Sequence, residues 1–255
     1  MEPMKEMCLH AWKLAVEPFR VIGPLYYVGN LNVGCYLLDS GDGLILIDTA
    51  FPQTVYQLFE SIRKVGFDPR DIKIILLTHG HYDHCGGMKK VKEYTKAEVY
   101  AGKEDLFILQ DRHDMLYCFD LEYEEFAIDH FYEENVPIQL GNISITPVHT
   151  PGHTPGTYSL FFELEEAGRS YRCGLQGGLG LNTLTDDYIK SSGQPLQVRR
   201  DYLDSLQKIE NYPIDVVIPS HPNQASLFEK QKQGTVDAFI CPGEWKEMLE
   251  EKRVE

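Results

Sequence analysis

The sequence lacks the features that mark a secreted or membrane-bound protein. No apolar run approaches the roughly 18 residues that a membrane-spanning helix needs. The first residues, MEPMKEMCLHAWKLAVEPF, have no basic region followed by a sustained apolar stretch, as a secretory signal would. The six cysteines include no CxxC pair, which favours reduced thiols over a disulfide framework in a chain of this size. We therefore predict a cytoplasmic protein without a membrane partner.

Basic residues are also scarce. The chain has 24 Lys and Arg against 39 Asp and Glu, which gives a formal net charge of −15 with histidines neutral. Phosphate backbones and anionic lipid surfaces attract Lys and Arg and repel carboxylates. The composition therefore argues against nucleic acid as a partner, and it carries no signal for an oligomeric state.

The 255 residues, with 43% hydrophobic and 11% aromatic side chains, are enough for a globular protein with a sizeable core. Continuous or alternating apolar runs predict strands, and 3.6-residue spacing predicts helices. We find no internal repeat and no linker, so we predict a single domain over residues 1–255. The predicted strands are 24–30, 34–40, 43–49, 72–78, 97–102, 143–150, 157–164, 169–175 and 215–221, and the predicted helices are 53–64, 88–94 and 198–209.

Residues 101–135 form an insert of different composition. Acidic residues far outnumber basic ones there, and Phe and Tyr are frequent, which argues against simple disorder. We predict helices and loops with an acidic outer face. A lid or a subunit contact is the alternative interpretation.

The stretch THGHYDHCGG, residues 78–87, concentrates metal-ligand side chains directly after a predicted buried strand. It offers His79, His81, Asp83 and His84, and zinc favours imidazole and carboxylate ligands. Neighbouring residues cannot easily share one tetrahedron, so the four side chains suit two metal ions better than one. A closed structural zinc site would instead favour cysteines in pairs.

Further ligands must come from histidines elsewhere in the chain. HTPGHTPG offers His149 and His153, and VVIPSH ends in His221. Both segments follow predicted strands, whose ends can deliver side chains to a shared rim. The remaining histidines lack such settings, and we predict surface or packing roles for them: His10, His113 and His130.

These motifs resemble the metallo-β-lactamase fold superfamily. THGHYDHCGG matches its HxHxDH signature, with GLILIDTA before it and HTPGHTPG and VVIPSH after it, in the family's order. The resemblance runs from about Tyr26 to Ser226. It implies an α/β fold, a four-layer αββα sandwich with its metals at one edge.

The resemblance also implies two Zn²⁺ ions per chain. Six residues match the family's ligand positions: His79, His81 and His153 for the first zinc, and Asp83, His84 and His221 for the second. Asp48, in LILIDTA, resembles the aspartate that steadies the metal loop. We name Tyr82 and Gln176 as candidate substrate contacts, with simple packing the alternative for Tyr82.

One departure from the family pattern concerns a bridging carboxylate. Many relatives, including glyoxalase II-like thioesterases and quorum-sensing lactonases, carry a metal-bridging aspartate in a GD pair after the third histidine. Here the strand reads YRCGLQGG, and we predict that Gly174 occupies that place. The β-lactamase subclass with His-His-His and Asp-His-His zinc sites also lacks this aspartate, although it often has a serine there. The sequence around the metal motif resembles that subclass.

The resemblance implies a zinc-dependent hydrolase that uses a metal-bound hydroxide on a cyclic amide or ester carbonyl of a small, β-lactam-like or related substrate. Asp83 is the candidate to orient the water and pass a proton. A lactone or thioester hydrolase is one alternative. Another is an iron-dependent oxidoreductase of the same fold, such as a persulfide dioxygenase. Diiron members typically replace the second histidine with glutamate, whereas His81 keeps the hydrolase pattern.

Overall fold

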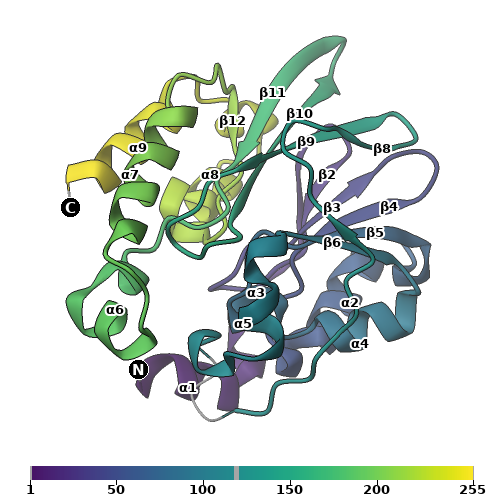
Figure 1. The fold of residues 1–255 in the computed structure, drawn as a ribbon. Helices are drawn as coiled ribbons and strands as arrows, with labels where there is room; N and C mark the ends of the chain where they lie inside the picture. Colours follow the sequence, from purple (N-terminus) through teal and green to yellow (C-terminus); the bar gives the residue numbers. More distant parts are fainter. Residues whose placement is uncertain (1, 118–120, 255) are drawn as a thin grey trace.

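The computed structural model describes residues 2–117 and 121–254 and shows two β-sheets packed face to face (Figure 1). In this part of the chain the first sheet has seven strands in sequence order. These strands are β1 (Phe19–Ile22), β2 (Leu25–Tyr27), β3 (Tyr36–Asp39), β4 (Leu44–Ile47), β5 (Ile72–Leu76), β6 (Glu98–Ala101) and β7 (His130–Phe131).

The first sheet changes from antiparallel to parallel at β4. Strands β1 to β4 pair antiparallel, and a short turn with the sequence GDG, residues 41–43, joins β3 to β4. Strands β4 to β7 pair parallel, so the carboxyl ends of β4 and β5 lie at one edge. The four residues of β4 are all buried, as expected for an apolar run with both faces covered.

The second sheet has the order β12-β11-β10-β9-β8. Its pairs are antiparallel except β11 with β12, which run parallel. Its strands are β8 (Ile138–Leu140), β9 (Ile143–His149), β10 (Tyr158–Glu166), β11 (Arg169–Leu175) and β12 (Val216–Val217). The predicted strand 215–221 is therefore much shorter than expected, because the chain leaves the sheet before it reaches His221.

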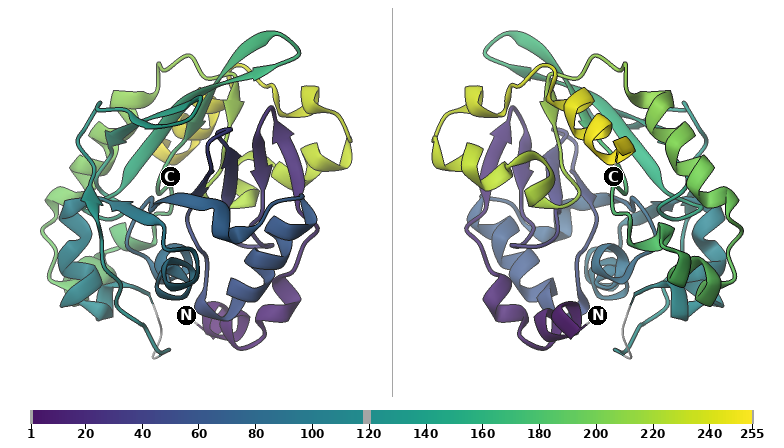
Figure 2. Two further views of the ribbon diagram at one scale, coloured as in Figure 1. Left: turned by 90° about the vertical axis from the view of Figure 1, so that its right-hand side faces the viewer. Right: turned by 90° about the vertical axis from the view of Figure 1, so that its left-hand side faces the viewer.

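Helices cover the outer faces of both sheets (Figure 2). Helices α2 (Val55–Lys64) and α4 (Met88–Thr95) pack on the first sheet, and α7 (Gln197–Ile209) and α9 (Glu244–Val254) on the second. A third apolar cluster fills the space between the sheets. These layers confirm the predicted αββα sandwich. The remaining α-helices are α1 (Glu2–Leu9), α3 (Tyr82–Cys85), α5 (Leu106–Gln110), α6 (Asp186–Ser192) and α8 (Leu227–Lys232).

The insert at 101–135 contains α5, short 3₁₀ turns, an irregular segment and β7. Residues 118–120 lie outside the described part of the chain, so the prediction for them has no structural counterpart. Most of the insert's acidic side chains are exposed or partly exposed, but Asp105 is buried.

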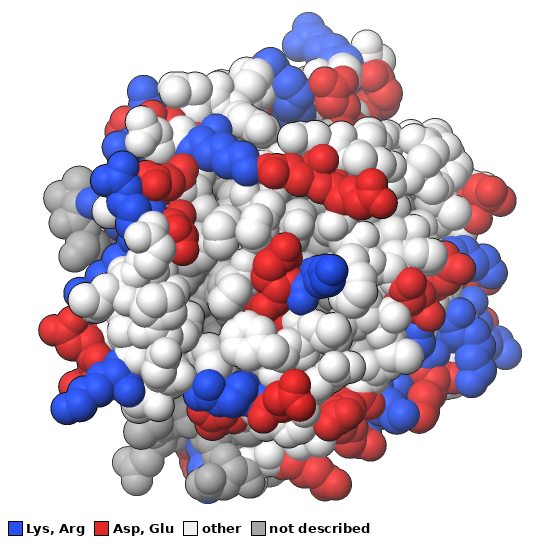
Figure 3. Space-filling view, in the orientation of Figure 1, with Lys and Arg blue, Asp and Glu red and all other residues white. Residues whose placement is uncertain are grey.

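No helix in the described ranges is long and apolar enough to cross a membrane. On the face seen in Figure 3, Lys and Arg side chains lie among Asp and Glu side chains. The five cysteines in the described residues are free thiols.

Candidate metal centre

Strand ends bring the predicted ligands together. Strand β5 ends at Leu76, and the HxHxDH residues follow it into α3. His153 lies in the turn between β9 and β10, and His221 follows β12. Loops at the carboxyl ends of strands commonly form the active sites of α/β sheets, and here such loops come from both sheets.

Three histidines form the first group: His79, His81 and His153, with candidate ligand atoms within 4.8 Å of one another. All three are buried. The ring centroid of His153 lies 4.7 Å from that of His79 and 4.5 Å from that of His81. Nothing in the described residues hydrogen-bonds the buried Nε2 atoms of His79 and His81. Buried polar atoms normally have partners, so these atoms fit a site that takes up a metal ion.

The second group contains Asp83, His84 and His221, again with candidate ligand atoms within 4.8 Å of one another. Asp83 Oδ2 lies 3.6 Å from His84 Nε2 and 3.7 Å from His221 Nε2. The rings of His79 and His84 are 4.2 Å apart, so the two groups are neighbours.

Burial keeps the first group uncharged. It lowers the pKa of His79 and His81 well below the usual range and lowers that of His153 to about 4. Neutral imidazole is the form that binds metals. His84 differs: burial alone would lower its pKa, but the carboxylates of Asp83 and Asp48 raise it.

Asp48 fixes His84 of the second group through a hydrogen bond on the side of the ring away from the other two ligands. Its carboxylate accepts hydrogen bonds from the Thr78 backbone N–H (2.8 Å), the Thr78 hydroxyl (2.8 Å) and His84 Nδ1 (2.7 Å). This orients His84 Nε2 toward Asp83 and His221. Asp48 has a φ of +57°, which is uncommon for a residue other than glycine, and such strain often occurs at functional sites.

Backbone carbonyls fix two further rings. His153 Nδ1 donates to the Gly180 carbonyl at 2.7 Å, and His221 Nδ1 donates to the Asn32 carbonyl at 2.7 Å. Each bond leaves Nε2 as the lone-pair nitrogen, in the manner of metal-bound histidines. The other histidine of HTPGHTPG, His149, belongs to neither group and bonds the Pro155 carbonyl.

Gly178 lies next to His153, the third histidine of the first group. The prediction that Gly174 occupies the place of the bridging aspartate is therefore wrong. Gly174 lies within β11, where a side chain would project onto Ile214 and Trp245. At Gly178 a Cβ would lie 2.8 Å from His153 Cγ. The inferred lack of a bridging carboxylate still holds, because residues 167–185 include no Asp or Glu.

The structure does not support Tyr82 and Gln176 as substrate contacts. The Tyr82 side chain is fully buried, and its hydroxyl accepts a hydrogen bond from the Gln53 amide and donates one to the Glu122 carbonyl. Tyr82 therefore has the packing role that was the alternative prediction. The Gln176 amide accepts from the N–H and donates to the carbonyl of Gly178. It therefore shapes the loop beside His153.

The insert instead contributes an aromatic side chain beside the first group. Tyr117 meets His81 edge-on, with ring centroids 5.1 Å apart, and stacks on Tyr188 of α6, also at 5.1 Å. Burial raises the pKa of the Tyr117 hydroxyl to about 12, so it stays protonated at neutral pH. These tyrosines carry no motif that sequence reasoning could have used.

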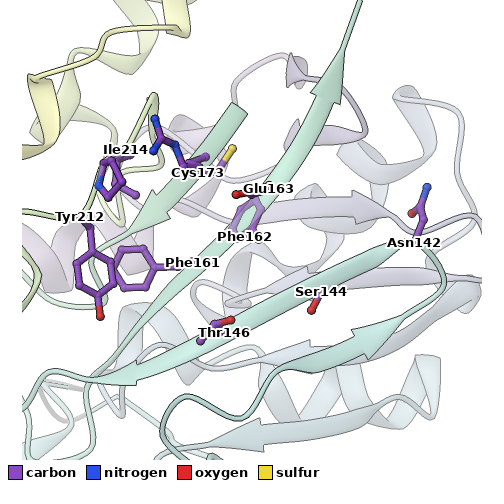
Figure 4. A pocket seen from close by; sticks show the side chains of 11 residues that line it. Asn142, Ser144, Thr146, Phe161, Phe162, Glu163, Cys173, Tyr212 and Ile214 are labelled. Atoms are coloured by element: carbon purple, nitrogen blue, oxygen red, sulfur yellow. The ribbon is translucent and has the colours of Figure 1, made fainter. Parts of the chain in front are cut away.

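A cavity of about 470 Å³ lies elsewhere, on the outer face of the second sheet (Figure 4). Phe161, Tyr212 and Ile214 line it together with polar residues of β9 and β10. None of the six candidate ligands lines this cavity, so we do not assign catalysis to it.

Comparisons with known proteins agree with this geometry. Residues 28–167 match the model of the metallo-beta-lactamase superfamily, and the chain belongs to this family. The subclass B3 metallo-beta-lactamase BJP-1 of Bradyrhizobium japonicum superposes with a TM-score of 0.85, at 29% identity over 97% of this chain and 94% of that one. The class B3 di-zinc enzyme LRA-12 from an Alaskan soil metagenome gives 0.84, at 29% identity over 96% and 94%.

Among curated sequences, an N-acyl homoserine lactonase of Bacillus cereus is 30% identical in an alignment that covers 54% of this chain. The chain spans 61% of that lactonase's length. The two ligand groups fit the subclass B3 site, as the sequence predicted.

Proposed function

We propose that the protein is a zinc-dependent hydrolase that binds two zinc ions and opens a cyclic amide or ester carbonyl in a small molecule. The observation that carries this proposal is the pair of adjacent groups, His79/His81/His153 and Asp83/His84/His221, with no Asp or Glu in residues 167–185 to bridge them. The di-zinc class B3 neighbour supports zinc as the metal.

Bound zinc would supply Lewis acidity and bring the pKa of water near neutrality. The chain's own residues position the chemistry. His79, His81 and His153 present uncharged imidazoles in a buried group, and His84 and His221 are held by Asp48 and by the Asn32 carbonyl. A rigid ligand shell of this kind reduces the reorganisation that the reaction requires.

Asp83 is our candidate for proton transfer. Its carboxylate faces both His84 and His221 and is almost fully buried. One oxygen can serve as a ligand while the other accepts a proton from water and passes it to the leaving group. Tyr117 and Tyr188 replace Tyr82 and Gln176 as candidate substrate contacts, because the Tyr117 ring lies against His81.

A β-lactam-like molecule is the substrate that we propose first, because the class B3 enzymes match nearly the whole chain. A lactone has the second, because the lactonases match about half of it. We keep two sequence predictions as proposals here: a cytoplasmic location, which the free thiols support, and a single domain over residues 1–255.

A substrate screen on the zinc-loaded protein tests the function, with a chromogenic cephalosporin and a panel of lactones. We expect turnover of the cephalosporin. A clear preference for lactones without lactam turnover would reverse the order of substrates. Metal analysis of protein purified without added metal tests the iron-dependent alternative, which requires iron rather than zinc.

Replacement of one ligand tests the centre itself. His153→Ala should remove one metal and most of the activity, because a three-histidine site loses one ligand. His149→Ala is the matched control, since His149 lies in the same HTPGHTPG motif and outside both groups. If the His153→Ala variant kept full metal content and rate, the assignment of the first group would fail.

A further inference from the structure

Asp105 connects two of the ligand loops through hydrogen bonds to residues beside the ligands. It lies at the end of a 3₁₀ turn, Lys103–Asp105, and is 1% exposed. Its carboxylate accepts hydrogen bonds from the Gly80 N–H (2.7 Å), the Thr154 hydroxyl (2.7 Å) and the Gly156 N–H (2.6 Å). All three donors are neutral, so the carboxylate is buried beside no partner of opposite charge among these contacts.

The donors sit directly beside the ligands of the first group. Gly80 separates His79 from His81, and Thr154 follows His153. The Asp105 carboxylate therefore joins the loop after β5, in the first sheet, to the loop after β9, in the second. These two loops supply all three histidines of the group, so their separation determines whether the histidines can share one ion.

The backbone is shaped to admit this carboxylate. A Cβ at Gly156 would lie 2.5 Å from Asp105 N and 2.6 Å from its Cγ. Real Cβ atoms essentially never come so close, so a larger residue would push the loop away from Asp105. The second glycine of HTPGHTPG is thus required by the approach of Asp105.

Asp48 supports the second ligand group, as Asp105 supports the first. It holds His84 of the second group and Thr78 before the first. Asp105 has no contact of this kind with Asp83, His84 or His221 among its hydrogen bonds. Asp48 therefore supports His84 directly and His79 through the Thr78 hydroxyl, whereas the hydrogen bonds of Asp105 go only to the loops of the first group.

We propose that Asp105 is a positioning residue that holds the two histidine loops at the separation the first metal ion requires, and so sets the affinity of His79/His81/His153 for metal selectively. This inference rests on the proposed two-metal centre. It concerns metal affinity rather than turnover, so it can be tested whatever the substrate is. Loss of such outer partners typically costs about 10- to 100-fold in metal affinity.

The test is a stepwise titration of the metal-free full-length chain with Co²⁺, followed by its absorption spectrum, and with ¹¹³Cd²⁺, followed by NMR. Two ¹¹³Cd nuclei bound by unlike ligand sets give separate NMR signals, so the metal occupancy of each group is measured separately. In Asp105→Asn we expect binding to the three-histidine group to weaken about 10- to 100-fold, with the Asp83/His84/His221 group unchanged. Excess zinc should restore kcat, because the ligands themselves are intact.

Two further variants separate positioning from general damage. Thr154→Val removes one of the three donors and keeps the side-chain shape, so it should weaken the same group by less. Asp215→Asn is the matched control: Asp215 also accepts a backbone N–H and pairs with Arg172, and it lies outside both ligand groups. It should leave both metal affinities unchanged.

Equal weakening of both groups in Asp105→Asn would overturn the proposal, as would unchanged affinity of the first group. If Asp105→Asn does not fold, Thr154→Val decides between these outcomes. A wild-type chain that binds two metals but hydrolyses none of the substrates would refute the proposed function and leave this inference standing.

Discussion

Gly178 offers a severe test of how the first metal group is built. Replacing it with alanine adds a Cβ that would lie 2.8 Å from His153 Cγ and 2.9 Å from His153 Cβ, and closer still to Cδ2. Ordinary van der Waals contact begins at 3.4 Å. The His153 ring must therefore move by on the order of 1 Å, although its Nδ1 is bonded to Gly180 on the same loop.

A displacement of that size is incompatible with the first metal. Zinc–nitrogen bonds are about 2.0–2.1 Å long and vary little, and a misplacement of about 1 Å can cost about 100-fold in rate. We expect Gly178→Ala to lose the metal of the three-histidine group and about 100-fold or more in kcat. Overpacking should cost about 1–3 kcal/mol in the free energy of unfolding. Metal analysis, a turnover assay and urea unfolding measure the three effects.

Gly174→Ala is the matched control on the neighbouring strand β11. Its Cβ would meet the Ile214 side chain at 3.0 Å and the Trp245 ring at 3.2 Å, on the face away from the metals. We expect a small loss of stability and two metals retained. If Gly178→Ala kept both metals and the full rate, the account of a glycine loop packed against His153 would be refuted.

Two further predictions concern Asp48 and the pH dependence of stability. Asp48→Asn should weaken metal binding at the Asp83/His84/His221 group by about 10- to 100-fold, because a neutral amide replaces the carboxylate that accepts the His84 Nδ1–H; a Co²⁺ titration measures this. Burial lowers the pKa of His153 from 6.5 to about 4, so the metal-free protein should be most stable above pH 6.5. The free energy of unfolding should decrease by on the order of 3 kcal/mol as the pH falls from 6.5 toward 4, because the unfolded chain then binds a proton at His153 that the folded chain does not. Urea unfolding across this range should show a smaller decrease in His153→Ala than in the wild type, and equal slopes would contradict the assignment.

Much of the fold could be predicted because its signals are local. The run IKIILLT predicted a strand buried on both faces, since such strands are apolar throughout, and the run GLILIDT predicted a second strand. The HxHxDH motif predicted four candidate ligands because strand ends and tight turns keep neighbouring residues together. Strand β1 and helix α9 were missed. In α9, Trp245, Met248 and Leu249 have helical spacing, but they are surrounded by charged residues, which hides the apolar pattern.

The missed parts of the site depend on long-range packing. Asp105 was one of many acids in the insert, and only the approach of the Gly80 and Gly156 loops distinguishes it. The misplaced glycine reflects the end of β11: the strand stops at Leu175, and the loop that follows turns Gly178 toward His153. A sequence indicates where a strand lies more readily than which loop residue meets a distant side chain.

Anomalous X-ray diffraction from protein purified without added metal tests the central claim most directly, with data collected on either side of the zinc and iron edges. The account predicts two zinc peaks per chain, one among His79, His81 and His153 and the other among Asp83, His84 and His221. Iron at these positions, or a single peak, would contradict the two-zinc centre on which the proposed hydrolysis depends.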